Sequence, residues 1–281
     1  MHEGIAIHLA PLALFHIGSF AVTNTLFTTL LVSLLLIVFA YFAGRSLKLK
    51  PGKFQAVLEL IIVFPYTFVR DTLEDEKAAE KLFPIVMTIF LLVLTVNWFG
   101  LLPIGEGIGF GGEHGFVPLF HASSTDLNFT LALALVAFFT IEIFGIAALG
   151  AFKYGKKFIT FASPIAFVVG LIELVSEVAR LISFSFRLFG NVFAGKVLIL
   201  VLASFVPLLL PVPFLAFELF VGFIQAAIFA LLTLFFTKIA ISGHAEHEHA
   251  DGHDGAEHGL AHAVVDERDL PHGITKTTIT T

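Results

Sequence analysis

The side chains best suited to chemistry are ionisable groups within two long apolar runs in the second half of the chain. Five lie in the first run, and the second run adds a glutamate with a glutamine seven residues later: Glu173, Glu177, Arg180, Arg187, Lys196, Glu218 and Gln225. An ionisable side chain inside a membrane costs about 3 kcal/mol on insertion scales. Such residues need partners, water or a function, so the pattern indicates a polar path for a small ion.

Helical spacing puts part of this set on one face of a helix. Glu173, Arg180 and Arg187 recur every seven residues, which keeps them on one face with a drift of about 20° per heptad. Ser183 and Asn191 lie four residues before and four after Arg187, and residues four apart are neighbours on a helix surface. The sequence therefore predicts a polar stripe centred on Arg187.

The second run carries polar groups on a face of its own. Glu218, Gly222 and Gln225 have helical spacing. Lys196 is nine residues from Arg187, about half a turn round the first helix, and is expected to face elsewhere. In an antiparallel hairpin Lys196 approaches Glu218, so the two could pair and offset each other's desolvation.

The residue types suggest different roles. Carboxylates such as Glu173 and Glu218 can take up and release protons, whereas an arginine with a pKa above about 12 keeps its proton. Arg187 is therefore predicted to be a fixed positive barrier that repels a cation and attracts a passing carboxylate. For Glu177 and Arg180 an internal salt bridge is an equally good interpretation.

Composition indicates that lipid is the solvent. Hydrophobic residues make up 57% of the 281 residues and charged residues 14%, against roughly a quarter charged in soluble domains. The chain has no cysteine, which excludes disulfides, zinc-thiolate sites and a thiol nucleophile.

Apolar runs predict an all-α polytopic membrane protein with about five membrane helices. They cover approximately residues 20–43, 82–102, 127–150, 163–205 and 214–241. A helix over 163–205 would be about 65 Å long, roughly twice the hydrocarbon thickness. The last two helices are therefore expected to form a long, strongly tilted hairpin with Pro211 and Pro213 in its turn.

The remaining segments define the domain organisation. Residues 54–69 predict an amphipathic helix interrupted by Pro65, and the sequence leaves open whether residues 54–70 cross the membrane or lie on it. Residues 20–243 are expected to form a membrane channel domain after an outside segment, 1–19. Residues 244–281, rich in His and acidic residues, predict a soluble, disordered tail.

Basic residues orient the chain across the membrane. They cluster after the first and third spans, at Arg45, Lys48, Lys50, Lys53, Lys153, Lys156 and Lys157, whereas the loop 103–126 has no Lys or Arg. Since cytoplasmic loops carry an excess of Lys and Arg, the N-terminus is expected outside and the C-terminus in the cytoplasm.

Four motifs resemble F-type ATP synthase subunit a. The segment from Ser183 to Gly195, SFSFRLFGNVFAG, closely resembles the arginine-bearing helix of that family, and its run R-L-F-G-N-x-x-A-G is specific to it. The segment 223–229, FIQAAIF, resembles the matching motif of the final helix. NWFGLLP at 97–103 and TDLN at 125–128 extend the resemblance, which covers about residues 20–243.

The resemblance implies roles for individual residues. Arg187 matches the family's essential arginine, which faces the ion-carrying carboxylates of the rotating c-ring, and Glu173 matches a polar position of a half-channel. Asn191 matches the asparagine of the motif. Gln225 matches the glutamine near the arginine on the neighbouring helix.

Two further positions differ among family members. Glu218 matches a position filled by His in some members and by Glu in others. Lys196 stands where many bacterial members have Glu and others have His, which puts a protonatable role there in doubt. Glu218 would then take over the half-channel function.

The implied function is that of a non-catalytic, proton-conducting stator subunit in a cell (inner) membrane. It would offer two half-channels to the c-ring, with Arg187 blocking direct leakage between them. The implied partners are c-ring subunits, the subunit b peripheral stalk, the rest of the complex and membrane lipid. No cofactor, metal or nucleic acid is expected, and the choice between proton and sodium as coupling ion stays open.

Two other classes of function are alternatives. A metal-ion transporter is suggested by the imidazoles of the tail, which suit zinc, nickel or copper: His244, His247, His249, His253, His258 and His262. No His lies in the two long helices, where a metal path would need ligands. An intramembrane hydrolase using Glu173 or Glu177 as an acid-base group is a weaker alternative, because it lacks a second catalytic group.

Overall fold

The computed structural model describes residues 12–18, 20–102, 108–112, 115–158, 164–206, 209 and 211–242. The chain divides into one compact unit, 1–241, and a second, 242–281. The expected tail 244–281 and most of the expected outside segment 1–19 lie outside the described residues, so the account below concerns the first unit.

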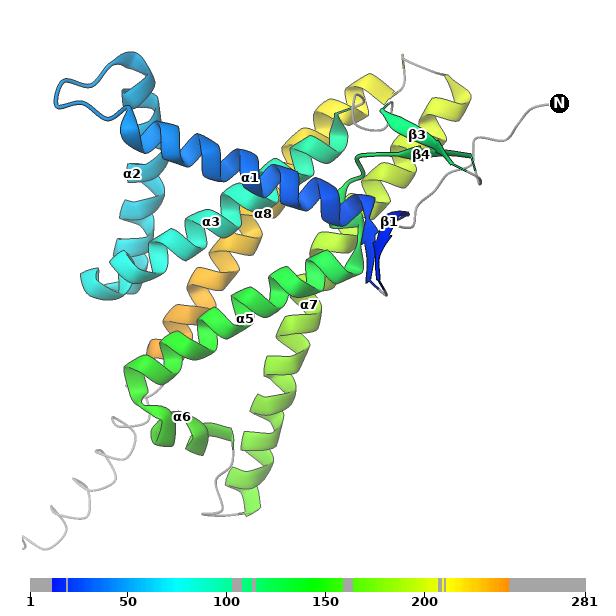
Figure 1. Ribbon diagram of the computed structural model, residues 1–281. Helices are drawn as coiled ribbons and strands as arrows, with labels where there is room; N and C mark the ends of the chain where they lie inside the picture. Colours follow the sequence, from blue (N-terminus) through cyan, green and yellow to red (C-terminus); the bar gives the residue numbers. More distant parts are fainter. Residues whose placement is uncertain are drawn as a thin grey trace, which may run out of the picture. The chain divides into compact units, whose positions relative to one another are not determined.

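Helices make up nearly all of the described chain, as predicted (Figure 1). They are α1 (Asn24–Arg45), α2 (Lys53–Leu73), α3 (Glu76–Leu101), the 3-10 turn η1 (Ser123–Thr125), α5 (Leu127–Leu149), α6 (Ala151–Phe158), α7 (Pro164–Phe205) and α8 (Pro211–Ser242). Two short antiparallel hairpins, which the sequence analysis did not predict, are formed by β1 (Ala13–Ile17) with β2 (Phe20–Thr23) and by β3 (Gly109–Gly112) with β4 (Gly115–Pro118).

Several of the described helices can span a bilayer. By length and composition α1, α3, α5 and α8 are long and apolar enough to cross a membrane, which makes the chain a polytopic membrane protein. α7 was predicted as a further membrane helix and is not among these four. At 42 residues it is about 63 Å long, roughly twice the hydrocarbon thickness.

The prolines act differently from the sequence prediction. α2 runs through Pro65 without a break, so the predicted interruption is wrong. The carbonyl of Ile61 that Pro65 leaves without a helical partner belongs to an exposed residue. Pro211 and Pro213 lie in the first turn of α8 and not in the hairpin turn. The first amide groups of a helix have no intrahelical acceptor, so a proline costs nothing there.

The main core lies where α3, α5, α7 and α8 meet. α5 packs along α7, and the small side chains of Ala134 and Ala137, both fully buried, permit the close approach that membrane helices need. α7 and α8 meet through larger rings. Phe184 lies 5.1 Å from Phe229 and 5.8 Å from Phe236 between ring centroids. α7 is therefore held from two sides, by alanines on α5 and by phenylalanines on α8.

A buried polar junction joins the N-terminal end of α5 to α1, α3 and α8. The Ser124 hydroxyl donates to Asn97 Oδ1 at 2.7 Å, and Asn97 Nδ2 donates to the Gly222 carbonyl at 3.4 Å. The Thr25 hydroxyl donates to Asp126 Oδ2 at 2.7 Å. Polar groups removed from water must be satisfied internally, and here one loop and three helices satisfy each other.

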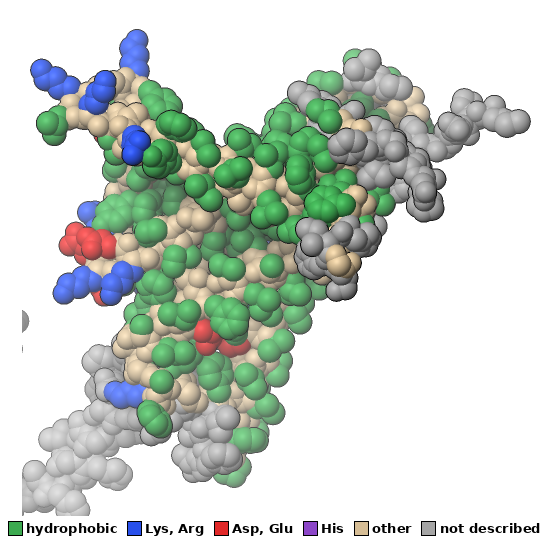
Figure 2. Space-filling model, viewed as in Figure 1, with side chains coloured by type: hydrophobic (Ala, Val, Ile, Leu, Met, Phe, Trp, Pro, Cys, Tyr) green, Lys and Arg blue, Asp and Glu red, His purple; other side chains and the backbone are tan. Residues whose placement is uncertain are grey.

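Basic side chains gather at one end of the bundle, along the left of Figure 2. There Lys238 of α8 pairs with Glu74 of the α2–α3 turn at 2.9 Å. The hydrogen bond from Lys238 and its positive charge hold the pKa of Glu74 below its usual range. Lys238 thus ties α8 to this turn.

Asn97→Ala is expected to destabilise the fold, because the Ser124 hydroxyl and the Gly222 carbonyl both lose a buried partner. The expected loss is about 1–2 kcal/mol, measured as a lower midpoint of thermal denaturation in detergent. Asn128→Ala is the control, since Asn128 is exposed and only its backbone N–H bonds to Asp126. Equal midpoints for the two variants would contradict the assignment of Asn97 as the junction's link.

Candidate functional site

Arg187 projects from an exposed face of α7. Its guanidinium makes one hydrogen bond within the described chain, a long one of 3.4 Å from Nη2 to Ser183 Oγ. No acidic side chain of the described residues lies within ion-pair distance of it. Phe186 and Ile182, about half exposed, belong to the same stretch. Arg187 is thus a permanent cation on a largely apolar surface of this subunit.

The predicted stripe of Glu173, Arg180 and Arg187 is only partly realised. Arg180 Nη1 donates to Glu177 Oε2 at 2.6 Å, and its guanidinium lies over the Phe236 ring of α8, 4.0 Å from the centroid. Arg180 is therefore engaged within the subunit, which agrees with the salt-bridge interpretation of this pair. Glu173 is half-buried.

Glu218 packs against Gly195. Gly195 lies about two turns after Arg187 along α7. Glu218 is 8% exposed, and a Cβ added to Gly195 would collide with its carboxyl group. Because successive residues of a helix differ by about 100°, Gly195 and its neighbour Lys196 cannot both face Glu218. The fold places Gly195, which has no side chain, against the Glu218 carboxyl.

Lys196 contacts a residue that the sequence analysis did not single out. Its ammonium lies 3.1 Å from Nδ1 and 3.3 Å from Nε2 of His121, and its suggested pairing with Glu218 is not among the ion pairs of the described chain. Lys196 and Asn97 also line a cavity of about 150 Å³ between α3, α7 and α8, which has room for a few water molecules. Only the fold brings His121 to α7, because 75 residues separate the two.

The remaining predicted site residues, Gln225 and Asn191, have no described hydrogen bond to the others. Gln225 is 5% exposed, and its Nε2 has no hydrogen-bond partner within the described chain. It lies one turn after Gly222, whose backbone approaches Asn97. Asn191 is half-buried on α7. A buried amide with spare donors is well suited to meet water or a group brought by another subunit.

Residues 26–238 match the family described as ATP synthase A chain. The chain belongs to the ATP synthase A chain family.

Named relatives agree with this assignment. The chain is 35% identical to ATP synthase subunit a of Helicobacter hepaticus over 224 residues, which cover 79% of this chain and 91% of the relative. It is 30% identical to that of Moorella thermoacetica over 239 residues, 84% and 99% of the two chains. With ATP synthase subunit a of Campylobacter fetus it shares 34% identity over 224 residues, 80% and 92% of the two chains.

Membership of the ATP synthase A chain family decides between the classes of function. The chain is a non-catalytic membrane subunit of ATP synthase, so the hydrolase and metal-transporter alternatives are wrong. Within the described part of the chain no cluster of three His, Cys, Asp or Glu side chains forms a metal site. The tail imidazoles lie outside the described residues.

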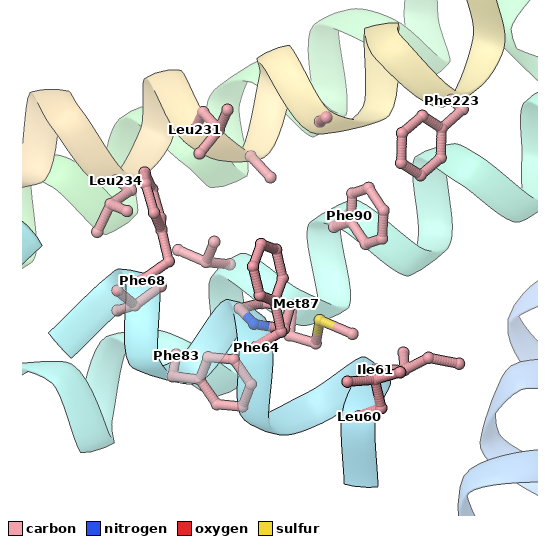
Figure 3. Close-up of a pocket in the computed structure, with 15 residues that line it drawn as sticks. Leu60, Ile61, Phe64, Phe68, Phe83, Met87, Phe90, Phe223, Leu231 and Leu234 are labelled. Atoms are coloured by element: carbon pink, nitrogen blue, oxygen red, sulfur yellow. The ribbon is translucent and has the colours of Figure 1, made fainter. Parts of the chain in front are cut away.

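An apolar groove lies elsewhere and carries no polar chemistry. It has a volume of about 400 Å³ and is lined by aliphatic and aromatic side chains of α2, α3 and α8, among them Phe64, Phe68, Met87, Phe90 and Phe223 (Figure 3). No ionisable side chain lines it. A groove of this composition suits a hydrocarbon surface and cannot conduct an ion.

Gly195→Ala is expected to slow ATP-driven ion pumping by the assembled complex in membrane vesicles several-fold, because the new methyl group would displace the Glu218 carboxyl. Gly44→Ala is the control, since a Cβ there meets open space near the end of α1. Pumping that is equally fast in both variants, at equal amounts of complex, would show that the position of Glu218 does not matter.

Proposed function

We propose that this chain is the ion-conducting stator of a rotary ATP synthase. It offers two half-channels to a ring of carboxylate-bearing c subunits, and Arg187 is the barrier between them. The observation that carries the proposal is the exposed, almost unbonded guanidinium of Arg187 on an apolar face of α7.

A lone guanidinium on such a face requires a partner from outside the subunit. Facing lipid, it would cost about 3 kcal/mol or more, and within the described chain it gains one long hydrogen bond in return. A carboxylate of the ring, passing along α7, would supply the missing anion. Because arginine does not lose its proton, the attraction survives every turn, and no proton can hop through this point.

Polar groups on either side of Arg187 mark the two half-channels. Towards one end of α7, about 13 Å along the axis, Lys196 borders the cavity of about 150 Å³ and Glu218 lies beside Gly195. Towards the other end, Glu173 lies about 21 Å away. Between them the buried rings and side chains of the main core separate the two polar regions, which is what alternating access to a rotating ring requires.

Three polar residues are assigned to the surroundings of Arg187. Ser183 is the hydrogen-bond partner of the guanidinium and limits where it can swing. Gln225 has an amide with unused donors, and Asn191 is half-buried one turn after Arg187. We assign them to holding water or the ring carboxylate near the barrier.

The end of the bundle rich in Lys and Arg (Figure 2) supports a cytoplasmic location for that end. Glu218 and His121 then belong to the outer half-channel, and Glu173 to the inner one. The N-terminus is outside, the C-terminus is cytoplasmic, and the membrane is the cell (inner) membrane. The peripheral stalk formed by subunit b holds the chain still while the ring turns.

The carboxylates of the path favour the proton as coupling ion, since each can bind and release one. A charge that crosses 100 mV carries about 2.3 kcal/mol. Several such steps in each turn of the ring would drive ATP formation in the rest of the complex, while this chain makes and breaks no covalent bond.

Arg187→Ala is expected to abolish proton-driven ATP synthesis without preventing assembly, because the side chain is exposed and contributes little to the fold. Removing the barrier should also let protons leak passively through membranes stripped of the ATP-hydrolysing sector. Both effects are measured in inverted vesicles, by ATP synthesis under an imposed gradient and by the decay of that gradient.

Arg45→Ala is the matched control. It removes an exposed arginine at the end of α1, whose guanidinium lies over Tyr41 far along the chain from the site. Normal proton pumping and normal ATP synthesis in Arg187→Ala vesicles would refute the proposed function.

A further inference from the structure

The corner between α1 and α2 carries a cluster of lysines. Lys48 and Lys50 lie between the two helices and Lys53 starts α2. All three are exposed, in the basic region at the upper left of Figure 2, and none forms an ion pair within the described chain. The acid next along α2 is Glu59, which accepts a hydrogen bond from Gln55 and lies about 120° round the helix from Lys53. The positive charge of the corner is therefore uncompensated by described acids of this segment.

One face of α2 leads from this corner to the apolar groove between α2, α3 and α8. The residues at helical spacing on that face are Lys53, Val57, Leu60, Phe64 and Phe68. All are exposed, and Leu60, Phe64 and Phe68 line the groove. Lys53 is about 10 Å from Leu60 along the helix axis. The lysines and the groove therefore belong to one continuous surface.

The groove has the length of a lipid chain in one leaflet. Along α8 it extends from Phe223 to Leu234, which is about 16 Å, and half of a hydrocarbon core of about 30 Å is about 15 Å. Phe223 and Phe90 lie at one end, with ring centroids 5.9 Å apart, and Phe68 and Leu234 lie at the other (Figure 3).

The volume of the groove favours a slender occupant. It is about 400 Å³, and a helix about 10 Å across fills roughly 400 Å³ with each turn. The groove could therefore enclose a single turn of a helix from another subunit, whereas one acyl chain can lie along its whole length.

The charges at the far end of α2 differ from those at Lys53. There Arg70 is paired with Asp71 at 3.1 Å, and Lys238 of α8 is paired with Glu74 at 2.9 Å. The start of α3 adds exposed residues of both signs: Asp75, Glu76, Lys77, Glu80 and Lys81. An anionic group is attracted to uncompensated lysines beside a membrane helix, so charge favours the Lys53 end.

We propose that this surface binds one anionic phospholipid, with its phosphate at Lys48, Lys50 and Lys53 and one acyl chain along the groove. The chain covers the exposed Phe64 ring and fills space that the side chains of α2, α3 and α8 leave open, so the lipid holds α2 against the other two helices. The inference does not depend on the proposed function, because none of these residues belongs to the proposed ion path.

The test uses the complete ATP synthase in phosphatidylcholine vesicles that contain a trace of a photoreactive lipid with a diazirine in one acyl chain. The photoreactive lipid is phosphatidylglycerol in one set of vesicles and phosphatidylcholine in the other. After illumination, mass spectrometry of peptides locates the modified residues. Phosphatidylglycerol is expected to label residues 83–90 and 223–234 several-fold more than phosphatidylcholine does, because only its headgroup carries a net negative charge.

Lys48→Gln combined with Lys53→Gln is expected to abolish this preference for phosphatidylglycerol, since the phosphate loses two cations. Lys77→Gln combined with Lys81→Gln is the matched control, because it removes two exposed lysines from the start of α3 and should leave the preference intact.

A second pair of variants tests the place of the acyl chain. Ala227 lines the groove, so Ala227→Leu should fill part of it and lower the labelling of residues 83–90 several-fold. Ala216→Leu is the control, since Ala216 is exposed on α8 and does not line the groove.

Equal labelling of the groove by the two lipids in the wild-type complex would overturn the proposal, and so would a preference that survives the loss of Lys48 and Lys53. Groove residues that neither lipid labels in the assembled complex would show that another subunit covers them, which also overturns it. If a variant does not assemble, the comparison of the two lipids on the wild-type complex decides alone.

Discussion

A permanent positive charge on a largely apolar surface is the constraint around which the chain is organised. Arg187 cannot shed its proton, and within the described chain it has one long hydrogen bond. A monomer that exposed this guanidinium to lipid would be destabilised by about 3 kcal/mol or more. Under the proposed function a carboxylate of the c-ring contributes the missing anion, so that incomplete bonding in one chain becomes the condition for a moving contact between two.

The fold isolates this charge from the acids of its own subunit. Glu177 is occupied by Arg180, which also packs on Phe236, and Glu218 is received by Gly195. Both carboxylates are thereby kept away from Arg187. A static salt bridge to either would neutralise the guanidinium and prevent the barrier role proposed for it. The same contacts also join α7 to α8.

Many elements were predictable because a membrane imposes simple rules on a sequence. Apolar runs of fixed minimum length identified the helices now seen as α1, α3, α5, α7 and α8. The prolines were misjudged because their effect depends on position within a helix: Pro65 is tolerated inside α2, and Pro211 starts α8. The two short hairpins were missed because four- or five-residue strands carry too little periodicity to recognise.

The sequence alone determined that the chain is a membrane protein, which helices it forms, and which arginine stands in the motif of its family, because those properties depend on composition and on local order along the chain. The tertiary structure determined which residues of different helices lie against each other. Lys196 lies against His121, Gly195 against Glu218, and Tyr154 against the turn after Glu142. Such pairings depend on the rotation and distance of packed helices, and spacing along one helix cannot specify the face that a second helix turns towards it.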